Sequence, residues 1–526
     1  MREHGAVTGP LPSTTARGKA LRREIAALGI AASCESADLS AASRDASPAA
    51  LFWNQARLVH HPPDVVAWPE DAEQVAALLQ LAGARGVPVV PMGAGAGTGG
   101  GAVALRGGIV LDTRRLTLPL RVDLPGNAVE VGAGMSAERL EERLAYAGAT
   151  LGHLMPPNDP GTVGGWLATR GAGMLSSRHG SSADLVLSLE AVDGAGEILH
   201  TLEGAGGGPD LAQLLLGSEG TLAVFTSARL RIWPRGRGRW LRAVRFPSLR
   251  EALRAVRDVV RAGLQPSVVL IHDPLDSLLG GAEPPRVPQP LKWLVEGAQV
   301  EAMRLALHAP RLLNRLVDAL PSSSLALLGF EGVDEADAFR EGEAALSLCA
   351  RAQGEDLGTA TAARCLESAR RASWTHGPLL AAGGFVETLD VATTWDRAEP
   401  LLAAVRGAVE GLAFVRAHFA HAAAEGCALE LKMLGLAGAP AEAMTRVPAE
   451  DAEAEMEEAQ QRREAVWGAA LAAAADEGAT ISHHSGIGAS RQVFLRRELG
   501  EGIRQLRALK KAFDPKGILN PGKVLL

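Results

Sequence analysis

Residues 161–186 read GTVGGWLATRGAGMLSSRHGSSADLV, and this stretch decides the fold. A glycine-rich run from Pro91 to Gly101 precedes it, and the shorter segment Gly217-Ser-Glu-Gly-Thr221 follows it. Glycine loses more conformational freedom on folding than any other residue, so a packed core gains nothing from such clustering. A backbone without side chains does let several N–H groups approach a bound anion closely. The three segments therefore predict contact with a phosphate-bearing cofactor.

The run from Pro91 to Gly101 also contains a literal GxGxxG pattern, at Gly95-Ala-Gly-Thr-Gly-Gly100. In the Rossmann dinucleotide fold these glycines lie between a strand and a helix. Here the run leads into a second predicted strand at 108–112, and the predicted helix at 69–82 comes before it. This order of elements argues against Rossmann-type NAD binding.

Composition and charge narrow the class of protein. The chain has 526 residues, of which 47% are hydrophobic and 21% charged, as in a globular protein with a sizeable core. Its formal net charge of -7 and pI near 6.1 argue against a nucleic-acid partner. The sequence shows no signal peptide, no membrane-spanning stretch and no CxxC pair, so we expect a cytoplasmic protein. Peripheral membrane contact and a homodimer stay open alternatives.

The order of predicted elements indicates an α+β fold of two lobes. Apolar residues at helical spacing predict the helix at 69–82, and short apolar runs predict strands at 87–90, 108–112 and 129–131. Longer helices alternate with strands after residue 240. We divide the chain into an N-terminal extension (1–58), a cofactor-binding domain (59–236), a cap or substrate domain (237–475) and a C-terminal segment (476–526).

Several motifs occur in an order that resembles the vanillyl-alcohol-oxidase type of FAD-binding protein, also called PCMH-type. They are the run after Pro91, GIVLDTRRL (108–116), VEVGAG (129–134), GTVGGWLATRGAG (161–173), LGSEGTLAV (216–224) and the closing RALKKAFDPKGILNPGK (507–523). The resemblance implies FAD lying between two α+β subdomains, with a cap domain over its ring and a C-terminal segment that returns to the flavin. The first loop has neither His nor Cys, so we expect noncovalent FAD.

The positions that match the family's cofactor contacts lie in the three glycine segments. They are Pro91, Gly93, Gly95, Ala96 and Gly97, then Gly161, Thr162, Thr169, Arg170 and Gly171, then Ser218, Glu219, Gly220 and Thr221.

Within this family the chain resembles the alkyldihydroxyacetonephosphate synthases (alkylglycerone-phosphate synthases) of ether-lipid biosynthesis. Trp166 and Arg170 stand where dehydrogenases of D-lactate or glycolate usually carry asparagines. The resemblance implies a transferase that exchanges an acyl for an alkyl group through an adduct at flavin N5, with a small or lipid-like substrate. Two alternatives stay open: an FAD-linked dehydrogenase or oxidase of a 2-hydroxy acid, and an FAD-binding protein with a degenerate catalytic site.

The chain departs from the synthase pattern where that chemistry is carried out. His376 falls at or near the position of a synthase arginine, and Leu429 falls at the position of a tyrosine. The histidine triplet of the synthases is reduced to His483 and His484, followed by Ser485. Loss of a positioned proton-transfer group typically costs 10²–10⁴-fold in rate. These departures keep the oxidoreductase alternative open.

Histidines are the catalytic candidates, because an imidazole can exchange protons near neutral pH. The adjacent pair in the turn around residue 484 is the first choice, and a structural role in that loop is the alternative. His418 and His421 form an HxxH pair whose spacing lets both reach one side of the site. The sequence shows no third metal ligand beside them, so we expect no metal. The full set of candidates is His483, His484, His418, His421 and His376.

Overall fold

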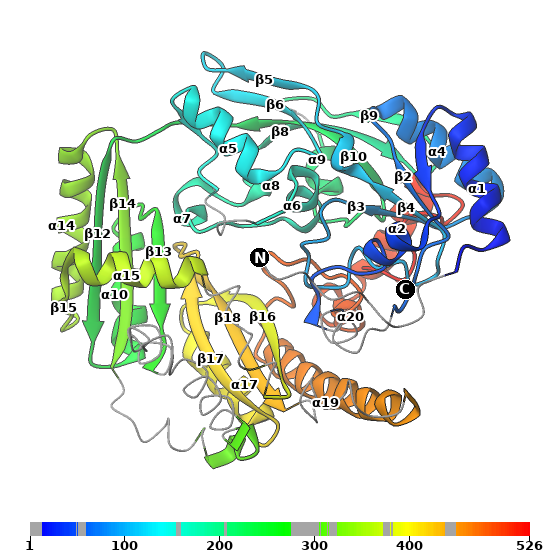
Figure 1. Ribbon diagram of the computed structural model, residues 1–526. Coiled ribbons are helices and arrows are strands. Elements are labelled where there is room, and N and C mark those ends of the chain that lie inside the picture. The colour runs from blue at the N-terminus through cyan, green and yellow to red at the C-terminus, as the bar shows by residue number, and fades with distance from the viewer. Residues whose placement is uncertain are drawn as a thin grey trace, which may run out of the picture.

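The computed structural model describes residues 13–48, 50, 59–153, 159–204, 208–274, 304–305, 307–312, 314, 323–371, 379, 382–436 and 449–525. Figure 1 shows the two smaller sheets of the N-terminal half on one side and a large sheet on the other, with the C-terminal helices returning to the first half. This is the two-lobed α+β arrangement that the sequence predicts. Among the described helices, none combines the length and apolar character needed to cross a membrane.

The first sheet has the strand order β1 (Ala31–Ser33), β2 (Val65–Trp68), β4 (Ile109–Asp112), β3 (Val89–Met92). Strands β2, β3 and β4 are parallel, and they are almost entirely buried, as expected for a parallel sheet covered on both faces. The neighbouring helices are α1 (Ala16–Ala27), α2 (Ser36–Ala41) and α4 (Ala72–Arg85). Helix α4 begins after Asp71, whose carboxylate accepts a hydrogen bond from the Gln74 N–H, and it ends at Gly86 in the left-handed region.

Part of the predicted N-terminal extension belongs to this sheet. Strand β1 pairs antiparallel with β2, and Leu21 and Ile25 of α1 are buried in the core that the sheet forms. The predicted boundary at residue 58 therefore separates this edge strand from the sheet to which it belongs. Three residues are too few for a period-two pattern to stand out.

The second sheet is antiparallel, with the order β5 (Leu120–Asp123), β6 (Ala128–Gly132), β10 (Ala223–Arg231), β8 (Val186–Asp193), β9 (Ile198–His200). Around it lie the 3-10 turn η1 (Thr113–Arg115), the helices α5 (Ala137–Tyr146), α6 (Val163–Thr169), α7 (Ser176–His179), α8 (Ser182–Leu185) and α9 (Leu211–Leu215), and the pair β7 (Ala149–Thr150) and β11 (Trp233–Pro234). Leu140, Leu144 and Leu167 pack against this sheet.

The third sheet has the order β15 (Glu355–Asp356), β12 (Gly238–Phe246), β14 (Ser324–Gly332), β13 (Val268–His272), β17 (Ala413–Ala420), β18 (Gly426–Leu436), β16 (Gly384–Thr394). Residues 238–436, which we call the cap region, also contain α10 (Leu249–Arg261), α14 (Glu335–Arg351), α15 (Gly358–Arg371) and α17 (Ala398–Val409). Phe246, Phe330 and Phe419 are fully buried in the larger core of this region. On the other face of the sheet Leu175 packs beside Val268 and Leu270, which joins the cap region to the N-terminal half.

The C-terminal elements connect both halves. They are α19 (Ala449–Asp476), α20 (Gln492–Leu499) and α21 (Gly502–Phe513). Trp467 and Leu471 of α19 lie in the core of the cap region. Beyond α21 the chain reaches the first sheet, where Leu519 forms a parallel bridge with Val89. The end of the chain therefore brings the segment between α19 and α20 to the border of the two halves.

Candidate functional site

The three glycine segments meet around one cavity of about 390 Å³. Its lining joins the loop after β3, the α6 segment and the turn before β10, with His484 and Ser485 at one side. Of the predicted cofactor contacts, the lining contains Pro91, Gly93, Gly95, Ala96, Gly97, Gly161, Thr162, Thr169, Gly171, Glu219 and Gly220. Segments separated by more than 100 residues thus contribute backbone to the same wall.

The loop of residues 93–98 is held through its carbonyl side. The Gly97 carbonyl accepts a hydrogen bond from the Ala46 N–H, and the Gly99 carbonyl accepts from Ala489 and Ser490. Within the described part of the chain, none of the amide N–H groups from Gly93 to Thr98 donates to another residue. Amides that lack a protein partner and border a cavity are suited to bind an anion.

The second segment approaches this loop so closely that a side chain would not fit. A Cβ added to Gly93 would lie 2.3 Å from Oγ1 of Thr162. That hydroxyl in turn accepts the Gly165 N–H and caps the first turn of α6. Gly93 is therefore required by the close approach of the Thr162 side chain to the loop backbone.

Three predicted cofactor contacts fall outside the cavity lining: Arg170, Ser218 and Thr221. Arg170 ends α6 in the left-handed region, with φ 55°, and its guanidinium donates to the carbonyls of Leu216 and Gln213. This residue connects α6 to the α9 segment. Thr221 turns back to donate to the Ser218 carbonyl.

Glu219 lines the cavity, but its carboxylate accepts hydrogen bonds from elsewhere in the protein. It accepts from the N–H groups of Ile487 and Gly488, more than 260 residues away. Burial raises the pKa of Glu219 to about 6, although these two donors oppose the shift. The residue adopts φ 49°, which aims its side chain across the turn toward the C-terminal segment.

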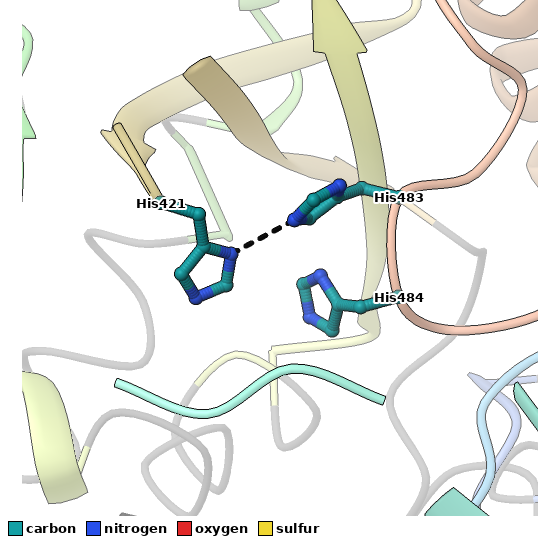
Figure 2. A group of neighbouring side chains, drawn as sticks. All are labelled: His421, His483 and His484. Carbon is teal, nitrogen blue, oxygen red and sulfur yellow. Dashed lines mark hydrogen bonds between the residues drawn. The ribbon is translucent and has the colours of Figure 1, made fainter. Parts of the chain in front are cut away.

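Three histidines lie close together, as Figure 2 shows, and one of them, His484, lines the cavity. His421 follows β17, whereas His483 and His484 lie in the loop between α19 and α20. Nδ1 of His421 lies 3.0 Å from Nε2 of His483, and Nε2 of His421 lies 2.9 Å from the Gly173 carbonyl. Because a carbonyl only accepts, Nε2 of His421 carries the proton, and Nδ1 accepts one from His483.

The environment keeps the imidazoles of His421 and His483 neutral near pH 7. Burial, and next the neighbouring His484, lower the pKa of His483 to about 4. The same two causes lower the pKa of His421 well below its usual value. A fourth histidine, His153, is 6% exposed and its ring lies tilted against Trp166, and burial lowers its pKa to about 4. A neutral imidazole keeps a lone pair, so it can accept a proton or bind a metal ion.

The other two candidate histidines have different positions. His418 lies two residues before the end of β17, where its Nε2 is 3.6 Å from the Glu430 carboxylate and its ring lies near His272. The HxxH pair is thus divided between the sheet and the cluster. His376 lies outside the described residues.

Two residues near the cluster were not singled out from the sequence. His153 stands eight residues before Gly161, and only its closeness to that motif could have drawn attention to it. Asp390 is an acid between the buried Leu389 and Val391 of β16, and it is 1% exposed. A buried carboxylate normally has a specific partner, which is the signal that could have found it.

Ring nitrogens of His421, His483 and His484 all lie within 4.8 Å of one another, so this cluster could hold a metal ion. Only His421 of the HxxH pair belongs to this cluster, and the other two ligands, His483 and His484, come from the loop between α19 and α20. The expectation of no metal stays a prediction.

Comparison with known proteins decides the family. The FAD binding domain family matches residues 63–202, and the family described as FAD linked oxidases, C-terminal domain, matches residues 239–524, more than half of the chain. The chain belongs to the FAD-linked oxidase family. FAD is therefore its cofactor, as predicted, and the unpartnered amides beside a glycine-lined cavity fit the pyrophosphate of FAD. Noncovalent attachment stays a prediction.

Relatives of this FAD-linked oxidase family member fall into two groups. Alkyldihydroxyacetonephosphate synthase of Trypanosoma brucei brucei is 24% identical over 90% of this chain and 75% of its own length. D-lactate dehydrogenase of Archaeoglobus fulgidus is 37% identical, but over only 38% of this chain and 45% of its own length. A solved alkyldihydroxyacetonephosphate synthase has the same fold, with a TM-score of 0.71 at 21% identity, covering 96% of this chain and 84% of that one.

Proposed function

We propose that this protein is an FAD-dependent transferase that exchanges an acyl for an alkyl group on a dihydroxyacetone phosphate ester. The observation that carries the proposal is the cluster of three histidines at the FAD cavity, in a chain whose likeness to alkyldihydroxyacetonephosphate synthases extends over most of its length. Bound FAD would supply the reactive ring of the reaction. The task of this chain is to place the substrate carbon against that ring and to move its proton.

His484 is the histidine of the cluster that lines the cavity, and we assign it direct contact with the substrate. Its Nδ1 lies 3.6 Å from the buried Asp390 carboxylate, which stabilises a positive charge on the ring. A proton accepted by His484 would therefore be held beside an anion. The His421–His483 pair stands next to it as a second acceptor, fixed in orientation by the Gly173 carbonyl.

A second candidate is oxidation of a 2-hydroxy acid. Leu429 occupies the strand position of the synthase tyrosine, and it is fully buried between β16 and β17. The strand thus presents no hydroxyl at this point. The chain is 37% identical to the D-lactate dehydrogenase of Archaeoglobus fulgidus over the stretch they share, against 24% for the synthase of Trypanosoma brucei brucei. This higher identity also favours the second candidate.

The test is an anaerobic reaction of the holoprotein with two sets of substrates. One set is an acyl-dihydroxyacetone phosphate with a fatty alcohol, and the other is a panel of D-2-hydroxy acids. The proposal predicts release of the fatty acid and formation of the alkyl product with no net change in the oxidation state of the flavin. Bleaching of the flavin by a hydroxy acid would replace the proposal with the second candidate. Inertness toward both sets would indicate a degenerate site.

A further inference from the structure

The loop of residues 481–491, which we call the histidine loop, wraps around the carboxylate of Asp390. Oδ2 of Asp390 accepts hydrogen bonds from three consecutive N–H groups, those of His483 (3.0 Å), His484 (2.8 Å) and Ser485 (3.0 Å). Its other oxygen, Oδ1, accepts from the guanidinium of Arg491 at 2.5 Å. Asp390 lies on β16, so the cap region fixes one side of the loop.

The other side of the histidine loop is fixed by Glu219 of the FAD-binding half. Oε1 of Glu219 accepts the N–H of Ile487 at 2.5 Å and that of Gly488 at 3.0 Å. Glu219 is 7% exposed. Five backbone N–H groups within six consecutive residues therefore bind two buried carboxylates, one from each half of the molecule.

The glycines of the loop allow this close approach. Gly486 adopts φ 77°, and a Cβ added there would lie 2.8 Å from Cδ of Glu219. Gly488 adopts φ 54°, and a Cβ there would lie 2.0 Å from the Gly99 carbonyl oxygen. The loop thus packs directly on both Glu219 and the glycine run of the FAD cavity, and a small movement of either would be transmitted to the histidines.

Charge reinforces the arrangement at Asp390. Burial alone would raise the pKa of this carboxyl, but Arg491, His484 and the backbone donors outweigh burial and hold the pKa below its usual range. Asp390 is therefore ionised at neutral pH. Charge-assisted hydrogen bonds of this kind are roughly twice as strong as neutral ones.

We propose that Asp390 and Glu219 are positioning residues that together hold His483 and His484 in register with the FAD cavity. Asp390 binds residues 483–485 and Arg491, and Glu219 binds the stretch between them at Ile487 and Gly488, so neither half of the molecule alone determines where the imidazoles lie. This inference rests on the proposed proton-transfer role of the histidines. It assigns to Glu219 a role through the loop in place of direct contact with the cofactor.

The test uses the FAD-loaded full chain with ¹⁵N-labelled histidine, in the variants Asp390→Asn and Glu219→Gln. Two matched controls are Glu387→Gln, which changes a buried acid on the same strand paired with Arg463, and Asp514→Asn, which changes a buried acid that accepts two N–H groups of another turn. The imidazole ¹⁵N resonances of His483 and His484 are assigned from His483→Gln and His484→Gln.

We expect both test variants to shift the resonances of His483 and His484 while FAD stays bound, and both controls to leave them in place. With an active substrate, kcat should fall about 100-fold for Asp390→Asn and about 10-fold for Glu219→Gln, because misplacement of a reacting group by about 1 Å is enough for such losses. KM should change little.

Unmoved resonances in Glu219→Gln would overturn the proposal, even if Asp390→Asn does not fold. Equal shifts in the control variants would overturn it as well, since the effect would then be general loosening. The ¹⁵N resonances of the imidazoles can be measured without a substrate. A wild-type protein that is inactive toward every substrate would contradict the proposed function, and the positions of the imidazoles would still decide the positioning role.

Discussion

The FAD cavity and the histidine cluster are adjacent, but they are built by different means. Many residues that line the cavity are glycines, and they lie close together within each segment. The cluster is made of side chains from two places 62 residues apart, brought together by the order of β16, β17 and β18 in one sheet. Backbone contact leaves a local signature in a sequence, whereas a side-chain cluster depends on the tertiary fold.

The largest effect is expected from a substitution in the glycine-lined FAD cavity. Gly93→Val places a branched side chain where even a Cβ would lie 2.3 Å from Thr162 Oγ1, so the loop must move and the protein should be purified without FAD. The measurement is the flavin absorbance per protein, before and after incubation with FAD. Gly407→Val, in a helix with open space around the Cα, is the control and should retain FAD.

This difference explains how far the sequence could lead. The glycine segments predict the FAD-binding fold because their spacing and order are local features, and the family match confirms both fold and cofactor. The pairing of His421 with His483 could not be predicted, since nothing local shows that the end of β17 meets the histidine loop. Arg170 shows a different limit of prediction from sequence. It lies inside a cofactor-binding motif, but its side chain binds backbone carbonyls next to the site and does not line the cavity.

The next largest effect is expected from a substitution in the histidine cluster. His483→Gln removes a neutral imidazole and its hydrogen bond to His421, so turnover should fall about 10²–10⁴-fold while FAD affinity is kept. Turnover and the dissociation constant of FAD are measured on the same preparation. His200→Gln, at an exposed position on β9, should leave both unchanged. Loss of FAD in His483→Gln would show that the two regions are not separable.

A third prediction concerns pH. The pKa of His153 is lowered to about 4 in the folded protein against about 6.5 in the unfolded chain, so the folded state takes up its proton less readily. The resulting stability is complete above pH 6.5 and is lost as the pH falls toward 4, by up to about 3 kcal/mol. Chemical unfolding at pH 7 and pH 4.5 measures this loss.

His153→Gln should flatten that pH dependence by a comparable amount, whereas His200→Gln should not. An unchanged slope in His153→Gln would mean that the acid sensitivity arises elsewhere in the cluster, where burial also lowers the pKa of His483 and His421.

The smallest effect is expected at Arg170, and it tests whether this residue contacts FAD or only stabilises the structure beside the cavity. Arg170→Gln removes the guanidinium bonds to the Leu216 and Gln213 carbonyls, so the free energy of unfolding should fall by about 1 kcal/mol. FAD affinity should stay the same, because Arg170 does not line the cavity. Isothermal titration with FAD distinguishes this expectation from a direct contact, which would weaken binding at least 10-fold.

The most direct test of the central claim measures FAD binding and turnover together in Gly93→Val and His483→Gln. If backbone holds the cofactor and imidazoles handle the proton, Gly93→Val loses FAD, and His483→Gln keeps FAD with an unchanged dissociation constant but loses turnover. A His483→Gln protein that binds FAD and turns over at the wild-type rate would contradict the account.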